Sequence, residues 1–267
     1  MNDITEAEFS QFQRLIFQSA GITLSDGKKA LVGSRLANRL RHYELDTYGE
    51  YFQVLNHGEG ALEMQTAIDL LTTNETYFFR EPKHFVFLKK QLTSMPPRSH
   101  PLRIWSAAGS TGEEAYSIAM LLEDMLPGQP WEVFGSDIST RVLERARRGL
   151  FSTARTDNIP PDYLRRFCLK GQGENNGTLL IERALRKKVS FQQVNLNEAL
   201  PPIGKFEMVF LRNVLIYFDD DTKRKVVARV LHTLRPGGWL LIGHSETLHG
   251  ITDVVESLAP AIYRKPL

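Results

Sequence analysis

Hydrophobic residues in the first seventy positions recur every three or four residues, the spacing of one face of an amphipathic helix. The first such stretch begins at Thr5 and Glu8, which are spaced as a capping box. Asp46 can cap the third stretch, and Ser25 or Asp26 the second. Helices are expected over 6–20, 28–43, 46–55 and 61–71. Residues 1–80 are therefore predicted to form an all-helical N-terminal domain.

After Pro82, which suits the first position of a helix, short apolar runs alternate with helical stretches. Strands are expected over 103–106, 131–136, 189–194, 207–211 and 239–243, with helices over 82–92, 113–126, 140–148 and 222–234, the last closed by the Arg-Pro-Gly-Gly stretch at 235–238. Continuously apolar strands are typical of a parallel sheet covered on both faces. Residues 81–267 are predicted to form a doubly wound, Rossmann-like α/β domain.

One region, about 160–188, interrupts this alternation. Two short strand-like runs there flank a turn rich in glycine and asparagine, which predicts an antiparallel β insertion. The turn contains Gly171, Gly173 and Gly177, residues that tolerate positive φ. An exposed edge of such an insertion offers unpaired backbone groups to an added strand.

Composition narrows the class of protein. The 267 residues are 42% hydrophobic and 24% charged, with a net charge of +2, which gives no general reason to expect nucleic-acid binding. The single cysteine, Cys168, and a polar N-terminal stretch favour a soluble cytoplasmic protein without membrane insertion. The seven histidines show no metal-ligand spacing, so no metal is expected.

A loop of small residues follows the first expected strand. Ala107, Gly109 and Gly112 match the dinucleotide fingerprint G-x-G-x-x-G without its first glycine. Asp137 ends the second strand, where a carboxylate can accept hydrogen bonds from ribose hydroxyls. Alternatively, the glycines only permit close packing and Asp137 only caps the helix at 140–148. The two features together favour a ribose-bearing ligand.

The helix after this loop begins with Glu113 and Glu114, which would repel a pyrophosphate at that position. A ligand with a cationic end suits the site better. S-adenosylmethionine carries an adenosine, a sulfonium and an ammonium but no phosphate, so it is the predicted cofactor.

Four segments together make the sequence specific: NETYFFR at 74–80, WSAAGSTGEEAYS at 105–117, FLRNVLIYF at 210–218 and LRPGGWLLIGHSE at 234–246. They resemble the chemotaxis receptor protein-glutamate O-methyltransferases, the CheR family of class I methyltransferases. The resemblance implies transfer of methyl from S-adenosylmethionine to glutamate side chains on the cytoplasmic helical bundles of chemoreceptors, with S-adenosylhomocysteine as product.

The resemblance also implies site residues. Asp137 would hold the ribose, Glu114 would face the ammonium, and Asn195 would bind the adenine. The full set of implied cofactor contacts is Asn74, Thr76, Arg80, Glu114, Asp137, Asn195, Leu196, Arg212 and Asn213. Arg80 and Tyr217 are the expected catalytic residues, one holding the acceptor carboxylate and the other orienting it.

No general base is needed for this chemistry, because a glutamate with a pKa near 4.3 is already ionised at neutral pH. The sequence shows no Ser-His-Asp, Cys-His or paired-acid pattern that would supply one. His244 is accordingly interpreted as a structural residue.

Partner binding is expected at two places. Lys28, Arg35 and Arg39 fall near one face of the helix at 28–43 and could dock acidic receptor helices, although a solvated face is an equally good interpretation. The insertion, with Gly171, Gly173 and Gly177, could bind a receptor C-terminal tail peptide, as it does in some members of the resembled family.

Other functions use much the same residues. A class I methyltransferase with a different acceptor, or a non-catalytic S-adenosylmethionine-binding regulator, would share the cofactor site. A nicotinamide enzyme is disfavoured by the two glutamates at the helix start.

Overall fold

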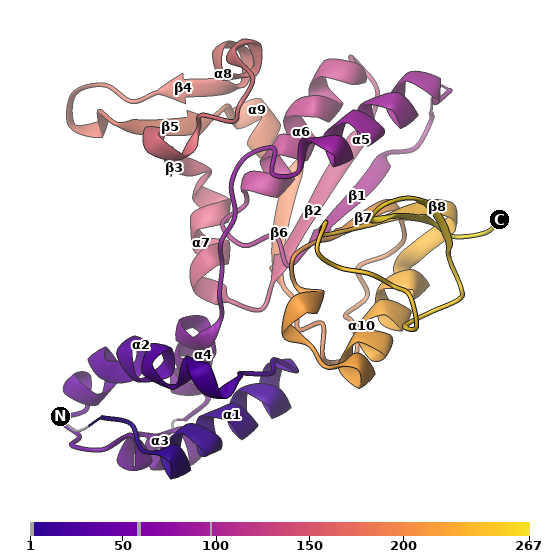
Figure 1. The fold of residues 1–267 in the computed structure, drawn as a ribbon. Coiled ribbons are helices and arrows are strands. Elements are labelled where there is room, and N and C mark those ends of the chain that lie inside the picture. Colours follow the sequence, from indigo (N-terminus) through magenta and orange to yellow (C-terminus); the bar gives the residue numbers. More distant parts are fainter. Residues whose placement is uncertain (1–2, 58–59, 97) are drawn as a thin grey trace.

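Four helices form the N-terminal domain in the computed structural model, which describes residues 3–57, 60–96 and 98–267. Phe12, Leu36 and Tyr51 are fully buried at its centre. The helices are α1 (Glu6–Ala20), α2 (Lys29–His42), α3 (Tyr48–Asn56) and α4 (Gly60–Leu71). They lie together at the lower end of the molecule in Figure 1. The described part of this domain contains no strand, as the hydrophobic pattern predicts.

Helix starts agree with the sequence at α1 and differ at the next two helices. At α1, the Thr5 amide donates to Glu8 at 2.9 Å, and the Glu8 amide donates to the Thr5 hydroxyl at 3.3 Å, which confirms the capping box. The expected cap of α3 is wrong, because Thr47 caps it in a second box with Glu50. A short 3-10 turn, η1 (Asp26–Lys28), precedes α2, and Ser25 makes no side-chain cap.

The second domain is built on a seven-stranded sheet in the order β6-β2-β1-β7-β8-β10-β9. Its strands are β1 (Leu102–Ala107), β2 (Trp131–Asp137), β6 (Val189–Gln193), β7 (Phe206–Leu211), β8 (Leu234–Ile242), β9 (Glu256–Ala259) and β10 (Ile262–Arg264). The first five strands are mutually parallel, and β10 is antiparallel to both of its neighbours. Order 6-2-1-7-8 places the topological switch point between β1 and β7, where Rossmann-like sheets bind ligands.

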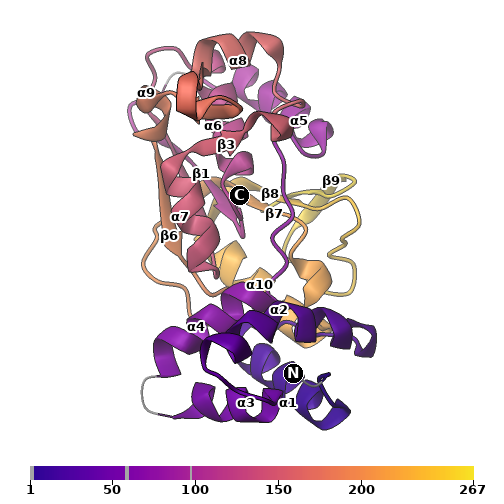
Figure 2. The same ribbon diagram turned by 90° about the vertical axis from the view of Figure 1, so that its left-hand side faces the viewer.

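Apolar residues on both faces of the strands explain the two helical layers. Met208 and Phe210 of β7 belong to a core with α5 (Pro82–Ser94) and α6 (Glu113–Met125). Val209 and Leu211 of the same strand belong to the opposite core with α10 (Asp220–Thr233). Helix α7 (Thr140–Arg148) packs against β2 and β6. Figure 2 shows the sheet between these helices.

Two details at the C-terminal end differ from the predicted pattern. Helix α10 ends at Thr233 and β8 begins at once, so the Arg-Pro-Gly-Gly stretch lies inside a strand instead of closing a helix. Glycine is required there, because a Cβ on Gly238 would lie 2.8 Å from the Glu207 carbonyl of the neighbouring strand. The β9–β10 pair was not predicted, since β9 is largely exposed and lacks an apolar run.

The insertion forms a separate three-stranded antiparallel sheet in the order β3-β5-β4. Its elements are β3 (Leu150–Ser152), η2 (Thr153–Arg155), α8 (Pro161–Phe167), β4 (Cys168–Lys170), η3 (Gly173–Asn175), β5 (Thr178–Ile181) and α9 (Arg183–Arg186). The β4–β5 hairpin is the expected one, and β3 joins it from outside the expected range. Gly173 and Gly177 in the turn have φ of 58° and 81°.

A long connection, residues 72–81, runs from α4 to α5 and joins the two domains (Figures 1 and 2). Two further contacts fix their arrangement. Ile22 forms an isolated bridge with Phe218. Asp69 of α4 accepts hydrogen bonds from the amides of Thr140 and Arg141 at 3.0 and 3.1 Å, and so caps α7 of the other domain.

Among the described residues, no helix has the length and hydrophobicity required to cross a membrane.

Candidate active site

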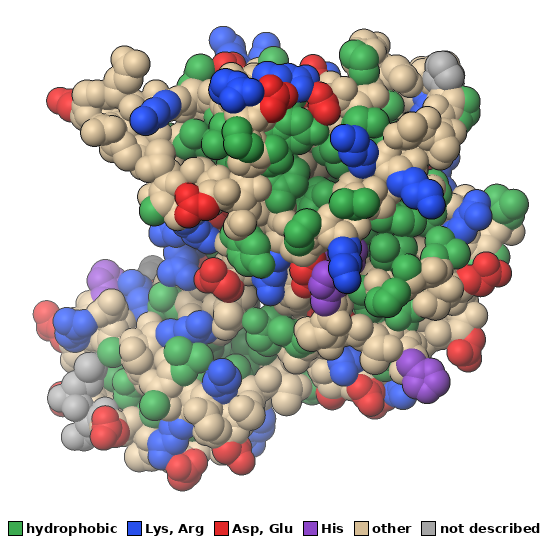
Figure 3. Space-filling model, turned by 45° about the horizontal axis from the view of Figure 1, so that its top comes forward, with side chains coloured by type: hydrophobic (Ala, Val, Ile, Leu, Met, Phe, Trp, Pro, Cys, Tyr) green, Lys and Arg blue, Asp and Glu red, His purple; other side chains and the backbone are tan. Residues whose placement is uncertain are grey.

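A cavity of about 570 Å³ lies between the N-terminal domain and the carboxyl ends of the central strands. This volume is in the range of small-molecule sites. Three regions form its wall: residues 20–35 of the helical domain, the connection at 71–80, and the loops that follow β1, β2, β6 and β7. Figure 3 shows hydrophobic, basic and acidic side chains close together on one face of the molecule.

The loop after β1 has an unusual backbone. Ala108, Ser110 and Gly112 have φ of 58°, 51° and 96°, in the left-handed region that costs energy for residues other than glycine. Gly109 lies between them, and a Cβ there would meet the Ser106 hydroxyl at 2.5 Å. The small residues of this loop therefore allow a compact turn that faces the cavity.

Asp137, at the end of β2, is tied to this loop. Its two carboxylate oxygens accept hydrogen bonds from the amides of Ser110 at 2.9 Å and Ser139 at 3.0 Å. Burial raises the pKa of Asp137 to about 6, although these amides favour the ionised form. Asp69 already accepts hydrogen bonds from the amides of Thr140 and Arg141, the first two residues of α7. Capping of α7 is therefore not a sufficient reason for a carboxylate at Asp137.

Arg212, after β7, lies in the cavity wall and contacts two carboxylates. Its guanidinium contacts Glu114 at 2.6 Å and Glu81 at 3.0 Å. Glu114 also accepts a hydrogen bond from the Ser106 hydroxyl at 2.7 Å. Burial raises the pKa of Glu114, and the Arg212 charge acts in the opposite direction. Glu114 and Arg212 both line the cavity, so its wall here holds a carboxyl group beside a buried cation.

Glu246, of the G-H-S-E stretch, holds the segment that carries Asn213 and Tyr217. Its carboxylate accepts hydrogen bonds from the amides of Asn213 at 2.9 Å, Ile216 at 3.2 Å and Gly243 at 2.5 Å. Asn213 has a left-handed φ of 57°, so the segment needs such support. The sequence pattern showed the motif but not this role.

The cavity wall brings together all the residues that the resemblance implies for the cofactor. They are Asn74, Thr76, Arg80, Glu114, Asp137, Asn195, Leu196, Arg212 and Asn213, and Tyr217 lines the same cavity. The side chain of Asn195 is engaged elsewhere: its amide donates to the Ser19 carbonyl at 2.7 Å and to Glu198 at 2.9 Å. This contact links the two domains.

The expected docking residues of α2 divide into two groups. Lys28 and Arg35 line the cavity. Arg39 lies outside it and forms a two-point contact with Glu63 of α4, at 2.7 and 2.6 Å, in which Glu63 also accepts from the Tyr51 hydroxyl. The guanidinium of Arg39 is thus paired with a carboxylate inside the helical domain.

The three glycines expected to bind a partner, Gly171, Gly173 and Gly177, lie in the β4–β5 turn and do not line the cavity. A different part of the insertion reaches toward it. Arg155 donates to the Thr76 carbonyl at 2.6 Å and approaches buried Glu113 at 3.4 Å. The insertion therefore contacts the connection that forms one wall of the cavity.

The doubly wound sheet, the cavity at its switch point and the carboxylate after β2 define a Rossmann-like nucleotide-binding protein. Comparison with known families gives a narrower assignment. Residues 74–263 match the family "CheR methyltransferase, SAM binding domain", and residues 7–72 match "CheR methyltransferase, all-alpha domain". The chain belongs to the CheR methyltransferase family.

Curated relatives agree over most of the chain. It is 41% identical over 264 residues to a chemotaxis protein methyltransferase of Salmonella typhimurium, covering 97% of this chain and 90% of that protein. The corresponding Escherichia coli protein is 42% identical over 246 residues, with 91% and 85% covered. Chemotaxis protein methyltransferase 2 of Pseudomonas aeruginosa is 40% identical over 262 residues, with 97% and 93% covered.

Proposed function

We propose that this protein transfers a methyl group from S-adenosylmethionine to glutamate side chains of chemoreceptors and forms glutamyl methyl esters. The observation that carries the proposal is the distribution of charge in the cavity. Acids that suit a cationic cofactor, Asp137 and Glu114, share one cavity with basic residues that suit an anionic acceptor, Lys28, Arg35 and Arg80. The names of the relatives, chemotaxis protein methyltransferases, support the choice of acceptor.

The residues present fit S-adenosylmethionine. Each Asp137 oxygen accepts one amide hydrogen, which leaves lone pairs for the ribose hydroxyls. Glu114 would hold the ammonium group, with its carboxylate fixed by Ser106 and Arg212. Adenine would lie at Asn195 and Leu196, contacted by the backbone there, because the Asn195 side chain binds Ser19. When bound, the cofactor supplies an electrophilic methyl on a sulfonium.

The role of the protein in the reaction is to position groups and exclude water. An acceptor glutamate is ionised at neutral pH, so no proton has to be removed before attack. Consistent with this, no histidine lines the cavity among the described residues. Arg80 would bind one acceptor oxygen and Tyr217 would orient the other. The negative charge of the acceptor carboxylate and the positive charge of the sulfonium cancel in the transition state. A site that excludes water would therefore increase the rate of methyl transfer.

The receptor bundle would dock at the mouth of the cavity beside Lys28 and Arg35. We assign Arg39 a smaller part in docking, because Glu63 already neutralises it. The exposed edge of β4 would bind an extended receptor tail peptide by strand addition. Such a tether raises the effective concentration of methylation sites without altering the chemistry.

Methyl-labelled S-adenosylmethionine, incubated with the protein and a membrane fraction that contains chemoreceptors, tests the proposal. Mild alkali should release the label as volatile methanol, because carboxyl esters hydrolyse under these conditions. Label that resists alkali would indicate another class of acceptor. Cofactor binding without any transfer, to receptors shown to be demethylated, would indicate a non-catalytic regulator instead.

A further inference from the structure

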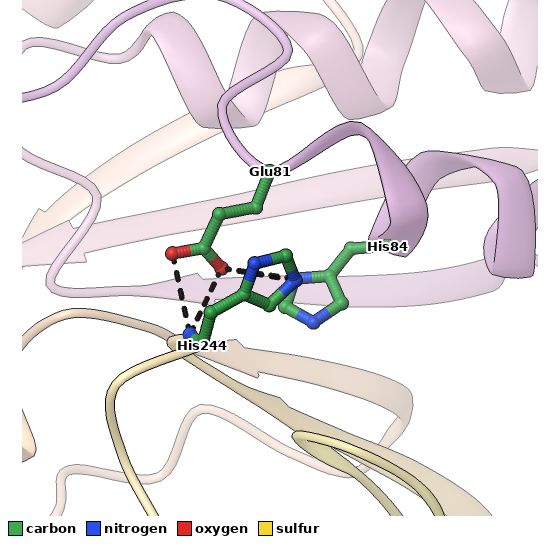
Figure 4. Close-up of side chains that lie close together, drawn as sticks. All are labelled: Glu81, His84 and His244. Carbon is green, nitrogen blue, oxygen red and sulfur yellow. Dashed lines mark hydrogen bonds and ion pairs between the residues drawn. The ribbon is translucent and has the colours of Figure 1, made fainter.

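Three side chains with metal-binding atoms meet just behind the cavity: Glu81, His84 and His244 (Figure 4). Glu81 precedes α5, His84 lies in the first turn of that helix, and His244 follows β8. Their ligand atoms all lie within 4.8 Å of one another. The sequence did not predict a metal because the two histidines are far apart in the chain, and only the fold brings them together.

His84 is the least expected member of this cluster. Its side chain is fully buried, and neither ring nitrogen has a hydrogen-bond partner within the described part of the chain. Its Nδ1 lies 3.4 Å from Glu81 Oε2, beyond good hydrogen-bond geometry. A buried imidazole without hydrogen-bond partners is unusual, and a ligand at one of its ring nitrogens would satisfy it.

The distances from Glu81 to the two histidines lie close to those around a four-coordinate ion. Zinc bonds of about 2.0–2.2 Å in a tetrahedron place the ligand atoms about 3.3–3.6 Å apart. His84 Nδ1 lies 3.4 Å and His244 Nε2 3.9 Å from the same Glu81 oxygen. The His244 side chain is 41% exposed, so a small rotation can bring it closer and an ion can reach the site from solvent.

We infer that Glu81, His84 and His244 form a binding site for a divalent ion of the zinc class, with its fourth position open to water or another small ligand. Two imidazoles and one carboxylate are a common ligand set for this ion. Neither the family description nor the names of the relatives mention a metal.

Such an ion would act on the cavity through Glu81. The Glu81 oxygen that faces both histidines also contacts Arg212 at 3.0 Å, and its other oxygen accepts from the Asn213 side chain at 3.2 Å. The ion and Arg212 would therefore compete for one carboxylate. Because Arg212 and Asn213 line the cavity, metal binding should lower affinity for cavity ligands.

Cobalt(II) titration of the purified full-length protein tests the site, since four-coordinate cobalt absorbs visible light strongly. Wild-type protein should bind one equivalent, and added zinc should displace it. His244→Ala removes an exposed ligand without disturbing the core and should weaken cobalt binding at least about tenfold. His249→Ala, at an exposed histidine outside the cluster, is the matched control and should bind as the wild type does.

Equal cobalt affinity in the His244→Ala and His249→Ala proteins would overturn the assignment, as would a wild-type protein that shows no visible cobalt band. His84→Gln gives a second check, because it keeps the volume of the side chain and should also weaken cobalt binding. None of these readouts depends on methyl transfer, so they stand apart from the proposed function. Titration of S-adenosylhomocysteine with and without zinc then measures the coupling.

Discussion

Asp137 should make cofactor affinity depend on pH between about 5 and 7. Burial raises the pKa of this carboxyl from 3.8 to about 6 in the ligand-free protein. Hydrogen bonds from two ribose hydroxyls would favour the charged form and lower this pKa in the complex. Affinity should therefore approach its maximum above pH 6. It should fall as pH decreases through 6, because binding then requires loss of the Asp137 proton.

The size of the effect follows from the fraction ionised. With a pKa of about 6, about one molecule in eleven carries a charged Asp137 at pH 5, so affinity should be about tenfold lower than at pH 7. The folding stability of the ligand-free protein should depend on pH in the opposite direction. A carboxyl with a raised pKa contributes stability that is complete below about pH 3.8 and is lost as pH rises through 6.

Isothermal titration with S-adenosylhomocysteine between pH 5 and 7 measures this dependence in a range where the ligand's own amino group stays protonated. Asp137→Asn should bind about 1–3 kcal/mol more weakly at pH 7, and its affinity should change little with pH. A wild-type affinity that is the same at pH 5 and pH 7 would refute the reasoning. An equal pH dependence in both proteins would assign the proton to another group, with Glu114 the first candidate.

Four further changes test separate parts of the account. Tyr217→Phe should slow methyl transfer about ten- to hundredfold with unchanged cofactor affinity, and an unchanged rate would reduce Tyr217 to a packing residue. Arg39→Glu should lower the free energy of unfolding in urea by about 3 kcal/mol or more, because it leaves Glu63 of the pair unmatched. Lys28→Glu should change stability by less than about 0.5 kcal/mol and raise the KM for receptor, whereas a cofactor defect would count against its docking role. Deletion of 173–177 should abolish binding of receptor tail peptides and spare cofactor affinity; unchanged amide signals in 167–189 on adding peptide would exclude the tether.

Local patterns predicted most of the fold. The Thr5–Glu8 box and the apolar runs of β1 and β7 act over a few residues, so their sequence alone indicates the element. The cap at Thr47 could also have been recognised, because Glu50 follows three residues later. The β9–β10 pair could not, since its pairing depends on the edge of β8 that the rest of the sheet provides.

In the candidate site, too, features set by local sequence were predicted and those set by contacts between distant elements were not. Asp137 and the loop at 108–112 were predicted because each follows a recognisable strand and takes its position from the topology. The engagement of Arg39 by Glu63, and of Asn195 by Ser19, depends on contacts between elements distant in sequence. The same is true of His244, which only the fold brings close to Glu81 and His84.

Peptide mapping by mass spectrometry tests the central claim most directly. A purified cytoplasmic fragment of a chemoreceptor from the same organism is incubated with the protein and S-adenosylmethionine, then digested and sequenced. The account predicts a mass increase of one methylene on specific glutamate side chains, lost after mild alkali and absent when those glutamates are replaced by alanine. Methylation confined to lysine, arginine or other nitrogen atoms, or an unmodified receptor fragment beside another methylated protein, would contradict it.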